Sequence, residues 1–362
     1  MTGPIATVAG ACLVASLLPL IPVAHGLVRS FDFARLQVIA VSGLALAAGL
    51  VLVLVQGDQT PVAVASMAMA FAALVIQTIH VLPFTPVWTK QTKRYDGQPD
   101  QTATISLLVC NVKQGNRDYA KVTGLLEERQ PDIAVFMETD KAWVQALLPH
   151  LDDYSETLAC PLSNSYGMLF ASRAHLREQE VRFLLNDEVP SISCVISLGN
   201  GEDVRIVALH PEPPVPTRDT KGRDAEILLV GEEARSEPLP MIVTGDLNDV
   251  AWSRTTRRFL RISRLLDPRQ GRGLFNSFDA RRWYLRWPLD HIFHSRDFEL
   301  VEIERLPPVG SDHFPMFYRF ALTDTNRNRP PPPASEGDLA EADETVACEK
   351  QRERAPVGTD WE

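Results

Sequence analysis

The chain opens with three long apolar stretches that are almost free of charged side chains. They cover about residues 5–28, 36–56 and 61–84. Each has the ~20 residues needed to cross a hydrocarbon core of about 30 Å, and none shows the polar face that a helix of a soluble bundle needs. The first stretch also differs from a cleaved signal peptide, because no basic segment precedes it and because it is longer than the apolar region of a typical signal peptide. Residues 1–84 are therefore predicted to form a three-helix transmembrane module.

The few charged residues around these stretches are unevenly distributed. Arg29 and Arg35 lie between the first and second stretches, and Lys90, Lys93 and Arg94 follow the third. With three crossings, both groups lie on the same side of the membrane. Because basic residues are retained on the cytoplasmic side, we expect a multi-pass cell-membrane protein whose remaining chain, after a polar linker at residues 85–103, is cytoplasmic.

From residue 104 to 322 the pattern changes to short β-rich runs interspersed with stretches of helical spacing. The β-rich runs are "TISLLVCN", "DIAVFME", "GMLFAS", "SCVISLG", "DVRIVALH", "PLPMIVTGD", "LDHIFHS", "ELVEIERL" and "FPMFYRFAL". Helical spacing is found at residues 119–129, 224–234 and 253–263 and in "DKAWVQALLPHL", where Asp140 is a candidate N-cap. Several β runs follow one another without a helix between them. This favours an α/β (α+β) four-layer sandwich, with two mixed sheets and outer helices, over a doubly wound sheet.

Composition changes this picture only at the C-terminal end. Residues 323–362 contain a proline run and many charged residues, mostly acidic beyond it, which is typical of a disordered tail. A polyproline docking segment at residues 329–333 is the alternative. The five cysteines include no CxxC pair and have no regular spacing, so neither a disulfide framework nor a zinc site is indicated.

Polar residues at the ends of the β-rich runs are the main functional signal. They are Asn111, Glu138, His210 and Asp246 with Asn248 at the ends of four runs, Asp290 at the start of another, and Asp312 and His313 just before the last. Any one of them is more often a turn or surface residue, since Asp and Asn bond the nearby backbone in turns. So many at strand ends are harder to explain by turn chemistry, because functional sites gather where strands of layered α/β folds end.

The residue types indicate one kind of chemistry. Oxygen ligands such as Glu138, Asp312 and Asn111, without a cysteine cluster, suit Mg²⁺ or Mn²⁺ better than zinc. Such a cation polarises a phosphoryl oxygen, and a carboxylate or imidazole can activate the attacking water. Asp246, His210 and His313 provide these groups.

In their order along the chain, these motifs resemble those of the endonuclease/exonuclease/phosphatase superfamily, which includes the DNase I-like nucleases, neutral sphingomyelinases and inositol polyphosphate 5-phosphatases. "METD", "GDLN", "LDH" and "GSDHFP" carry the resemblance, which covers about residues 104–322. It implies a DNase I-like catalytic domain. Glu138 would be the principal Mg²⁺ ligand, with Asn111 and Asp312 completing or adjoining the metal site. Asp246 would orient or activate water, Asn248 would hold a phosphoryl oxygen, and His313, held by Asp290, would act on the scissile phosphate. His210 matches the second catalytic histidine of the DNase I and sphingomyelinase branches.

One position departs from the superfamily pattern. Many relatives have an Asp two residues after the first Asn, where this chain has Lys113. A cation there would repel a second metal ion, so we expect a one-metal site or a phosphate contact by Lys113. Asn116 and Arg117 are further candidates for substrate binding, with loop capping as the alternative.

The substrate is left open by the sequence. The net charge of −10 is unfavourable for sequence-independent DNA binding, which depends on Lys and Arg. Between residues 254 and 286, however, ten arginines accompany only Asp267 and Asp279, either as a solvated helix face or as a surface for polyanions or anionic lipid headgroups. Membrane attachment favours a phosphodiesterase that acts on lipid headgroups or other membrane-proximal esters. A nuclease and a catalytically silent membrane scaffold are the alternatives. No protein partner is indicated.

Overall fold

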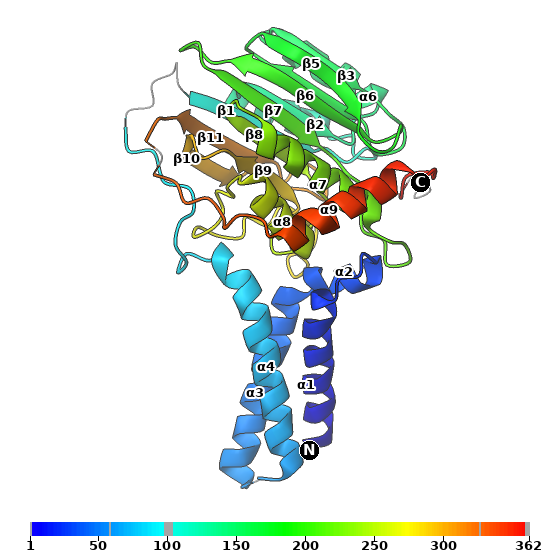
Figure 1. The fold of residues 1–362 in the computed structure, drawn as a ribbon, viewed down its shortest axis with the longest axis vertical. Coiled ribbons are helices and arrows are strands. Elements are labelled where there is room, and N and C mark those ends of the chain that lie inside the picture. Colours follow the sequence, from blue (N-terminus) through cyan, green and yellow to red (C-terminus); the bar gives the residue numbers. More distant parts are fainter. Residues whose placement is uncertain (1, 58, 98–103, 326, 359–362) are drawn as a thin grey trace.

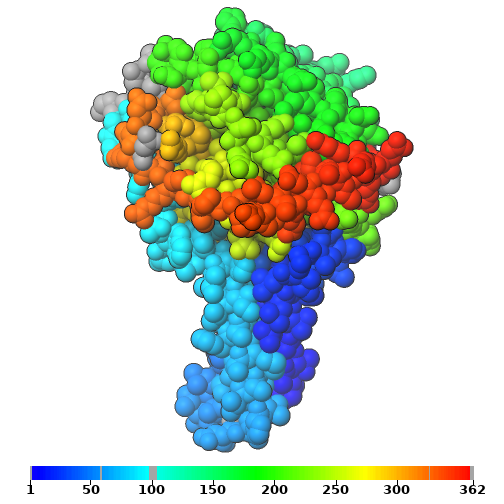
Figure 2. Space-filling view, viewed as in Figure 1, coloured from blue at the N-terminus to red at the C-terminus, as the bar shows by residue number. Residues whose placement is uncertain are grey.

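The computed structural model describes residues 2–57, 59–97, 104–325 and 327–358. Figure 1 shows a narrow stalk of N-terminal helices beneath a broad α/β head. In the space-filling view of Figure 2, the C-terminal segment lies across the head just above the stalk.

Three helices of the stalk are long and apolar enough to cross a membrane, judged by length and composition. They are α1 (Thr2–Leu17, continued by the 3₁₀ turn η1, Leu18–Leu20), α3 (Arg35–Gln56) and α4 (Pro61–Val81, continued by η2, Leu82–Phe84). Gly57 ends α3 in the left-handed conformation, and the Thr60 side chain caps α4 by accepting a hydrogen bond from the Ala63 N–H. A left-handed glycine at the C-terminal end and a threonine cap at the N-terminal end are both common at helix boundaries.

The first helical segment is shorter than the sequence pattern suggested. It ends at Leu20, and Ile21 is extended (φ −71°, ψ 133°). Pro22 follows Ile21, and a proline disfavours the helical conformation of the residue before it. A separate helix, α2 (Gly26–Phe33), then begins at His25, whose ring accepts a hydrogen bond from the Leu27 N–H. In Figure 1, α2 lies between the stalk and the head.

The head contains two mixed sheets. Within the described residues the strand orders are β10–β11–β1–β2–β4–β3 and β5–β6–β7–β8–β9. The first sheet consists of β1 (Thr104–Asn111), β2 (Ile133–Met137), β3 (Glu156–Cys160), β4 (Met168–Ser172), β10 (Phe298–Arg305) and β11 (Met316–Leu322). The second consists of β5 (Leu176–Phe183), β6 (Pro190–Ser197), β7 (Asp203–Leu209), β8 (Met241–Asp246) and β9 (Asp290–His294).

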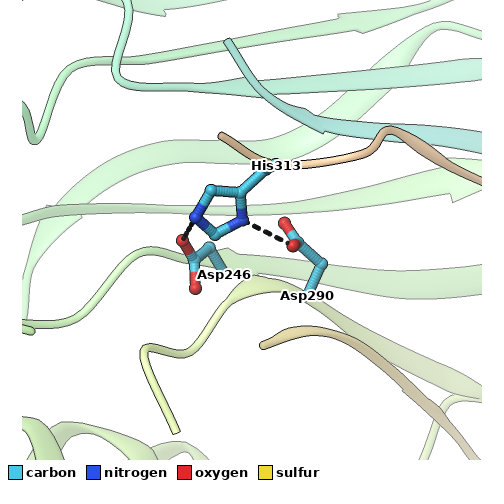
Figure 3. Close-up of side chains that lie close together, drawn as sticks. All are labelled: Asp246, Asp290 and His313. Atoms are coloured by element: carbon cyan, nitrogen blue, oxygen red, sulfur yellow. Dashed lines mark hydrogen bonds and ion pairs between the residues drawn. The ribbon is translucent and has the colours of Figure 1, made fainter. Parts of the chain in front are cut away.

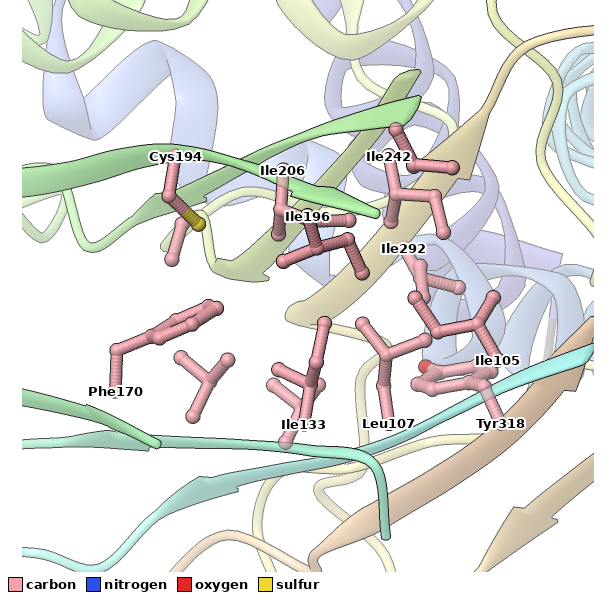
Figure 4. Close-up of a cluster of buried hydrophobic side chains, with 14 of the residues drawn as sticks. Ile105, Leu107, Ile133, Phe170, Cys194, Ile196, Ile206, Ile242, Ile292 and Tyr318 are labelled. Atoms are coloured by element: carbon pink, nitrogen blue, oxygen red, sulfur yellow. The ribbon is translucent and has the colours of Figure 1, made fainter. Parts of the chain in front are cut away.

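The main core lies between the sheets. Figure 4 shows Ile105, Leu107 and Ile133 of one sheet facing Ile206 and Ile242 of the other. All are almost inaccessible to solvent, and each buried aliphatic side chain contributes about 1.5–3 kcal/mol to stability. The alternating inward-facing positions of the β-rich runs thus hold the two sheets together.

Helices cover the outer faces and complete four layers. They are α5 (Tyr119–Arg129) and α6 (Lys141–Leu147, with η3, Leu148–His150) on the first sheet, and α7 (Lys221–Ser236) and α8 (Arg254–Ser263) on the second. Asp140 caps α6 by accepting a hydrogen bond from the Trp143 N–H (2.8 Å), as predicted. The four-layer sandwich of two mixed sheets and outer helices expected from the sequence is confirmed.

Part of the expected disordered tail is instead helical. Helix α9 (Glu336–Lys350) begins with a capping box at Ser335 and Asp338. It packs across α7 and α8, where Ala342 and Val346 join a buried apolar cluster. Basic residues of α8 form ion pairs with Asp338 and Glu341 of α9. These contacts order this part of the tail. Because they involve residues distant in sequence, the composition of the tail alone does not reveal them.

The stalk and the head are joined by specific contacts at α2. The indole N–H of Trp252 donates to the Asp32 carbonyl (2.8 Å), and that of Trp287 donates to the Phe33 carbonyl. At the other end of α2, the Gly26 N–H donates to the Arg218 carbonyl (2.8 Å). A Cβ at Gly26 would overlap the Val215 carbonyl oxygen. Only glycine permits this close approach, so α2 is an integral part of the head.

Candidate active site

Two parallel strand pairs bring the predicted polar residues to one edge of the head. Strands β1 and β2 run parallel, with Asn111 opposite Met137, and β7 and β8 run parallel in the other sheet. Glu138 directly follows β2, and Asp246 ends β8. The Asp246 N–H lies 3.0 Å from the Met137 sulfur, so the ends of the two sheets touch at this point.

Asn111 connects the two carboxylates. Its Nδ2 donates to Glu138 Oε1 (2.8 Å) and to Asp246 Oδ2 (3.0 Å). Asn111 and Asp246 are each 1% exposed. The amide therefore holds two buried or half-buried carboxylates that would otherwise repel each other, and it does so without neutralising their charge.

The segment after β8 is held tightly in place. Gly245 has φ +137°, and a Cβ there would overlap the Leu209 carbonyl oxygen, so glycine is required before Asp246. The Asn248 N–H donates to Asp246 Oδ1 (2.9 Å), and its side-chain amide donates to the Pro211 carbonyl (2.9 Å). The opening of "GDLN" is thus a rigid support for Asp246, and Asn248 faces the same cavity.

His313 lies between two aspartates. Its Nδ1 is 2.7 Å from Asp290 Oδ2 and its Nε2 is 3.4 Å from Asp246 Oδ2, as Figure 3 shows. Burial alone would lower the pKa of His313, but the charges of Asp290 and Asp246 outweigh it and raise the pKa to about 10. Ligand atoms of these three residues lie within 4.8 Å of one another, close enough to hold a cation. Because both ring nitrogens already face carboxylates, we interpret the group as an imidazolium held by two aspartates.

His210 flanks Asp246 on the other side. It follows β7 and is 3% exposed, with its Nε2 3.9 Å from Asp246 Oδ2. Among the described residues its Nδ1 has no hydrogen-bond partner. A buried, unbonded imidazole nitrogen in a cavity wall is available to a substrate or a water molecule.

Lys113 and Asp312 form an ion pair at the cavity. Lys113 Nζ lies 2.6 Å from Asp312 Oδ2, and the Arg281 guanidinium lies at the same distance. Burial by itself would raise the pKa of Asp312, but His313, Lys113 and Arg281 hold it below its ordinary value. Arg281 belongs to the arginine-rich interval, and no local motif distinguishes it from the other arginines there.

Three site positions have strained backbone. Lys113 (φ +59°), Glu138 (φ +60°) and Asn248 (φ +50°) adopt the left-handed conformation that residues other than glycine usually avoid. Such strain persists where the surrounding structure fixes it and is concentrated at functional sites. In each case a side chain is redirected at the end of a strand.

A cavity of about 540 Å³ joins these groups. It is lined by Lys113, Glu138, His210, Asp246, Asn248, Asp312 and His313, and also by Phe33, Tyr166, Pro213, Pro214, Phe278, Leu289, Val357 and Gly358. Two of these elements were not expected at the site. Phe33 comes from α2, and Val357 and Gly358 come from the C-terminal segment, where the Tyr166 hydroxyl donates to the Val357 carbonyl. No local sequence signal marks these residues, because only the fold brings them together.

Asn116 and Arg117, which the sequence suggested as substrate ligands, have other contacts. Asn116 donates to the carbonyls of Val112 and Val309 (both 3.1 Å), and Arg117 pairs with Asp140 at 2.7 Å. Neither lines the cavity. Both residues stabilise the loop between β1 and α5, which is the loop-capping alternative.

Many side chains of the arginine-rich interval also form contacts away from the cavity. Arg254, Arg258 and Arg261 pair with acidic residues of α9, and Arg269 is fully buried against Asp267 (2.7 Å). It is therefore chiefly a structural surface that holds α9, rather than an open surface for a polyanion.

Glu138 is the carboxylate best suited to a divalent cation. Its oxygens accept hydrogen bonds from Asn111 Nδ2 and the Gln114 N–H (3.2 Å). In the described part of the chain it has no ion-pair partner, whereas each aspartate of the site lies near a basic side chain. The nearby oxygen donors of Asn111 and Asp312, with no cysteine in the cavity wall, fit Mg²⁺ or Mn²⁺.

A sequence model of the Endonuclease/Exonuclease/phosphatase family matches residues 108–313. Among solved structures, an endonuclease/exonuclease/phosphatase from Beutenbergia cavernae has a TM-score of 0.50 at 15% identity, covering 61% of this chain and 72% of its own. TDP2 from D. rerio, complexed with single strand DNA product, also has a TM-score of 0.50 at 15% identity, covering 60% of this chain and 99% of its own. At this identity the likeness shows the fold alone. No curated protein matches the chain.

Proposed function

The chain belongs to the Endonuclease/Exonuclease/phosphatase family, and on that basis we propose that it is a membrane-anchored, divalent-metal-dependent phosphodiesterase. Members of this superfamily are hydrolases of phosphoester bonds. The proposal for this chain rests on one observation: Glu138, His210, Asp246 and His313, which are far apart in sequence, line a single cavity.

The bond change is hydrolytic. The oxygen of water forms a bond to phosphorus, the bond from phosphorus to the departing alcohol oxygen breaks in line, and one proton passes from the water to the departing oxygen. A cation held by Glu138, with Asn111 and Asp312 nearby, would polarise a phosphoryl oxygen. We assign the remaining steps to side chains of the cavity.

Asp246 is the residue that orients the water and accepts its proton. It is fixed by Asn111, by its neighbour Asn248 and by the electrostatic attraction of His313. His313, held by Asp290, presents positive charge to the phosphoryl oxygens, where charge develops during the reaction. His210, with its unbonded ring nitrogen, provides the proton for the departing oxygen. Lys113 and Asn248 contact the phosphate.

The lining of the cavity favours a substrate at the membrane surface. Phe33 belongs to α2, which lies between the candidate membrane spans and the head. With Pro213, Pro214, Phe278 and Leu289 it gives the cavity an apolar wall beside its polar groups. A phosphodiester attached to a lipid offers both a charged and an apolar part. We therefore propose a lipid headgroup or another membrane-proximal phosphodiester as the substrate, with the head in the cytoplasm.

A nuclease is the second candidate, since a solved structure with this fold is complexed with a DNA product. Against it, the protein has a net charge of −10, and many arginines near the motifs are paired with acidic residues. A catalytically silent scaffold is the third candidate. Its difficulty is that gathering ionisable groups in a buried site costs free energy that binding alone does not require.

The full-length protein in detergent should hydrolyse bis-p-nitrophenyl phosphate when Mg²⁺ or Mn²⁺ is supplied and lose this activity with EDTA. Asp246→Asn should lower kcat by at least about a hundredfold, as expected when a group that activates the nucleophile is removed. Absence of turnover with either metal would exclude the hydrolase proposal. Hydrolysis of single-stranded DNA faster than of lipid phosphodiesters in the same preparation would favour the nuclease.

A further inference from the structure

A second cavity lies where the chain leaves α4, and none of its lining residues belongs to the catalytic motifs. Its volume is about 450 Å³. It is lined by Pro86, Lys90, Arg94, Gly271, Arg272 and four residues of β10, Leu300 to Ile303. The wall therefore combines the segment after the third candidate span, the loop after α8 and an outer strand of the first sheet.

Three of the lining residues are basic and only one is acidic. In the described part of the chain, Lys90, Arg94 and Arg272 form no ion pair, and the acidic residue, Glu302, lies 3.8 Å from Arg129 of α5. The Arg272 guanidinium donates to two main-chain carbonyls, at Pro268 (3.0 Å) and Thr92 (2.8 Å), which fix its position without neutralising it.

The positive charges oppose one another. Burial, and then the nearby charge of Arg94, lower the pKa of Arg272. Holding like charges around one cavity costs free energy, and an anion in the cavity would reverse that cost through charge-assisted hydrogen bonds. Phosphate is well matched to guanidinium groups, which can bind two of its oxygens at once.

The cavity lies at the head end of the third candidate span. Pro86 follows η2 by two residues, and the Gly271 N–H donates to the Pro83 carbonyl (2.8 Å), which fixes the cavity loop to the end of the span. Beside Pro86, Val87 is 83% exposed and Trp88 is 43% exposed. Exposed tryptophans next to membrane spans are typical of the membrane–water interface.

We propose that this cavity binds the phosphate of an anionic membrane lipid. Lys90 and Arg94 approach the phosphate from the linker side and Arg272 from the head. The bound lipid would hold the head in a fixed orientation above the membrane. This role does not depend on catalysis, since none of the three cations lines the catalytic cavity.

The test compares Lys90→Gln/Arg94→Gln with a charge-matched control, Lys141→Gln/Arg235→Gln. All four side chains are exposed, so both variants should fold, which thermal melting in detergent will verify. Full-length protein is treated with EDTA so that no lipid is hydrolysed. It is then titrated with short-chain phosphatidylglycerol or phosphatidylcholine, and binding is followed by native mass spectrometry.

The wild type and the control should prefer phosphatidylglycerol. In Lys90→Gln/Arg94→Gln its apparent Kd should rise roughly thirtyfold, because each of the two basic residues near an anionic lipid surface contributes roughly a factor of five to the affinity. An equal loss of phosphatidylglycerol affinity in the control would overturn the proposal, and so would a wild type that does not prefer phosphatidylglycerol to phosphatidylcholine. So would displacement of the lipid by a short single-stranded oligonucleotide, or by inorganic phosphate at the same concentration, since the site would then bind nucleic acid or free anions.

Discussion

Replacing Asp290 tests whether His313 is positioned by a carboxylate or belongs to a metal centre. Asp290 is 1% exposed, and among the described side chains its carboxylate forms a hydrogen bond only with His313, at 2.7 Å, while Oδ1 has no hydrogen-bond partner. Asp290→Asn keeps the shape and can retain a neutral hydrogen bond, whereas Asp290→Ala removes the bond. Both variants should fold, because no other side-chain hydrogen bond of Asp290 is lost.

The expected loss of kcat follows from the strength of the hydrogen bond between Asp290 and His313. A hydrogen bond to a charged group contributes about 1.5–3 kcal/mol and a neutral one about 0.5–1.5 kcal/mol. If His313 must be held in place for the reaction, Asp290→Ala should lower kcat about ten- to 150-fold and Asp290→Asn about five- to tenfold, since ~1.4 kcal/mol corresponds to a factor of ten. KM for bis-p-nitrophenyl phosphate should change little.

The assay is steady-state hydrolysis of bis-p-nitrophenyl phosphate by the full-length protein at a series of Mg²⁺ concentrations. Asp297→Asn, in the turn between β9 and β10, is the control. A positioning role predicts an unchanged half-saturating Mg²⁺ concentration in both Asp290 variants. If that concentration rises instead and excess Mg²⁺ restores kcat, Asp290 is a metal ligand and our interpretation of His313 is wrong. Wild-type kcat in Asp290→Ala would refute any catalytic role.

Three further predictions concern other parts of the molecule. Glu138→Gln should raise the half-saturating Mg²⁺ concentration at least about tenfold, as for loss of a charged ligand, measured by the same assay; an unchanged value would place the metal elsewhere. Arg354→Ala should destabilise the protein by about 2–3 kcal/mol, because Arg354 contacts the nearly buried Glu212 through two bonds of 2.6 Å, so an unchanged thermal Tm would show that the C-terminal segment is not held this way. Burial, and then the charge of Glu212, raise the pKa of Glu226 to about 8, so the folded state binds a proton more tightly than the unfolded state. The Tm of the wild type should therefore fall relative to the Tm of Glu226→Gln as the pH rises from about 5 to about 8. Parallel curves of Tm against pH for the two proteins would contradict this.

The central strands and the polar residues of the site were predictable from local pattern. Asn111, Glu138 and Asp246 follow apolar runs whose buried positions identify the strands, and the parallel pairing of β1 with β2 brings their ends together. The three apolar helices were evident because nearly all their residues are apolar. The break at Pro22 was missed because hydrophobicity continues across it.

Other parts depend on contacts that no local pattern contains. Strand β5 has the sequence "LREQEVRF" and lies at the edge of its sheet with most side chains exposed, and a charged edge strand resembles a loop in composition. Helix α9 is held by arginines about 80 positions earlier in the chain, such as Arg258 with Asp338. Phe33 and Val357 reach the cavity from opposite ends of the sequence.

The two indole bonds to the end of α2 affect how the protein should be produced. A fragment starting at the predicted boundary, Thr104, would keep the carboxylates and histidines of the candidate site, yet it would leave Trp252 and Trp287 without their acceptors on Asp32 and Phe33. Such a truncation would also remove Phe33 from the wall of the cavity and expose two aromatic rings to solvent. Poor solubility or weak turnover of that fragment would reflect the missing helix, and the shortest useful expression product begins before Gly26.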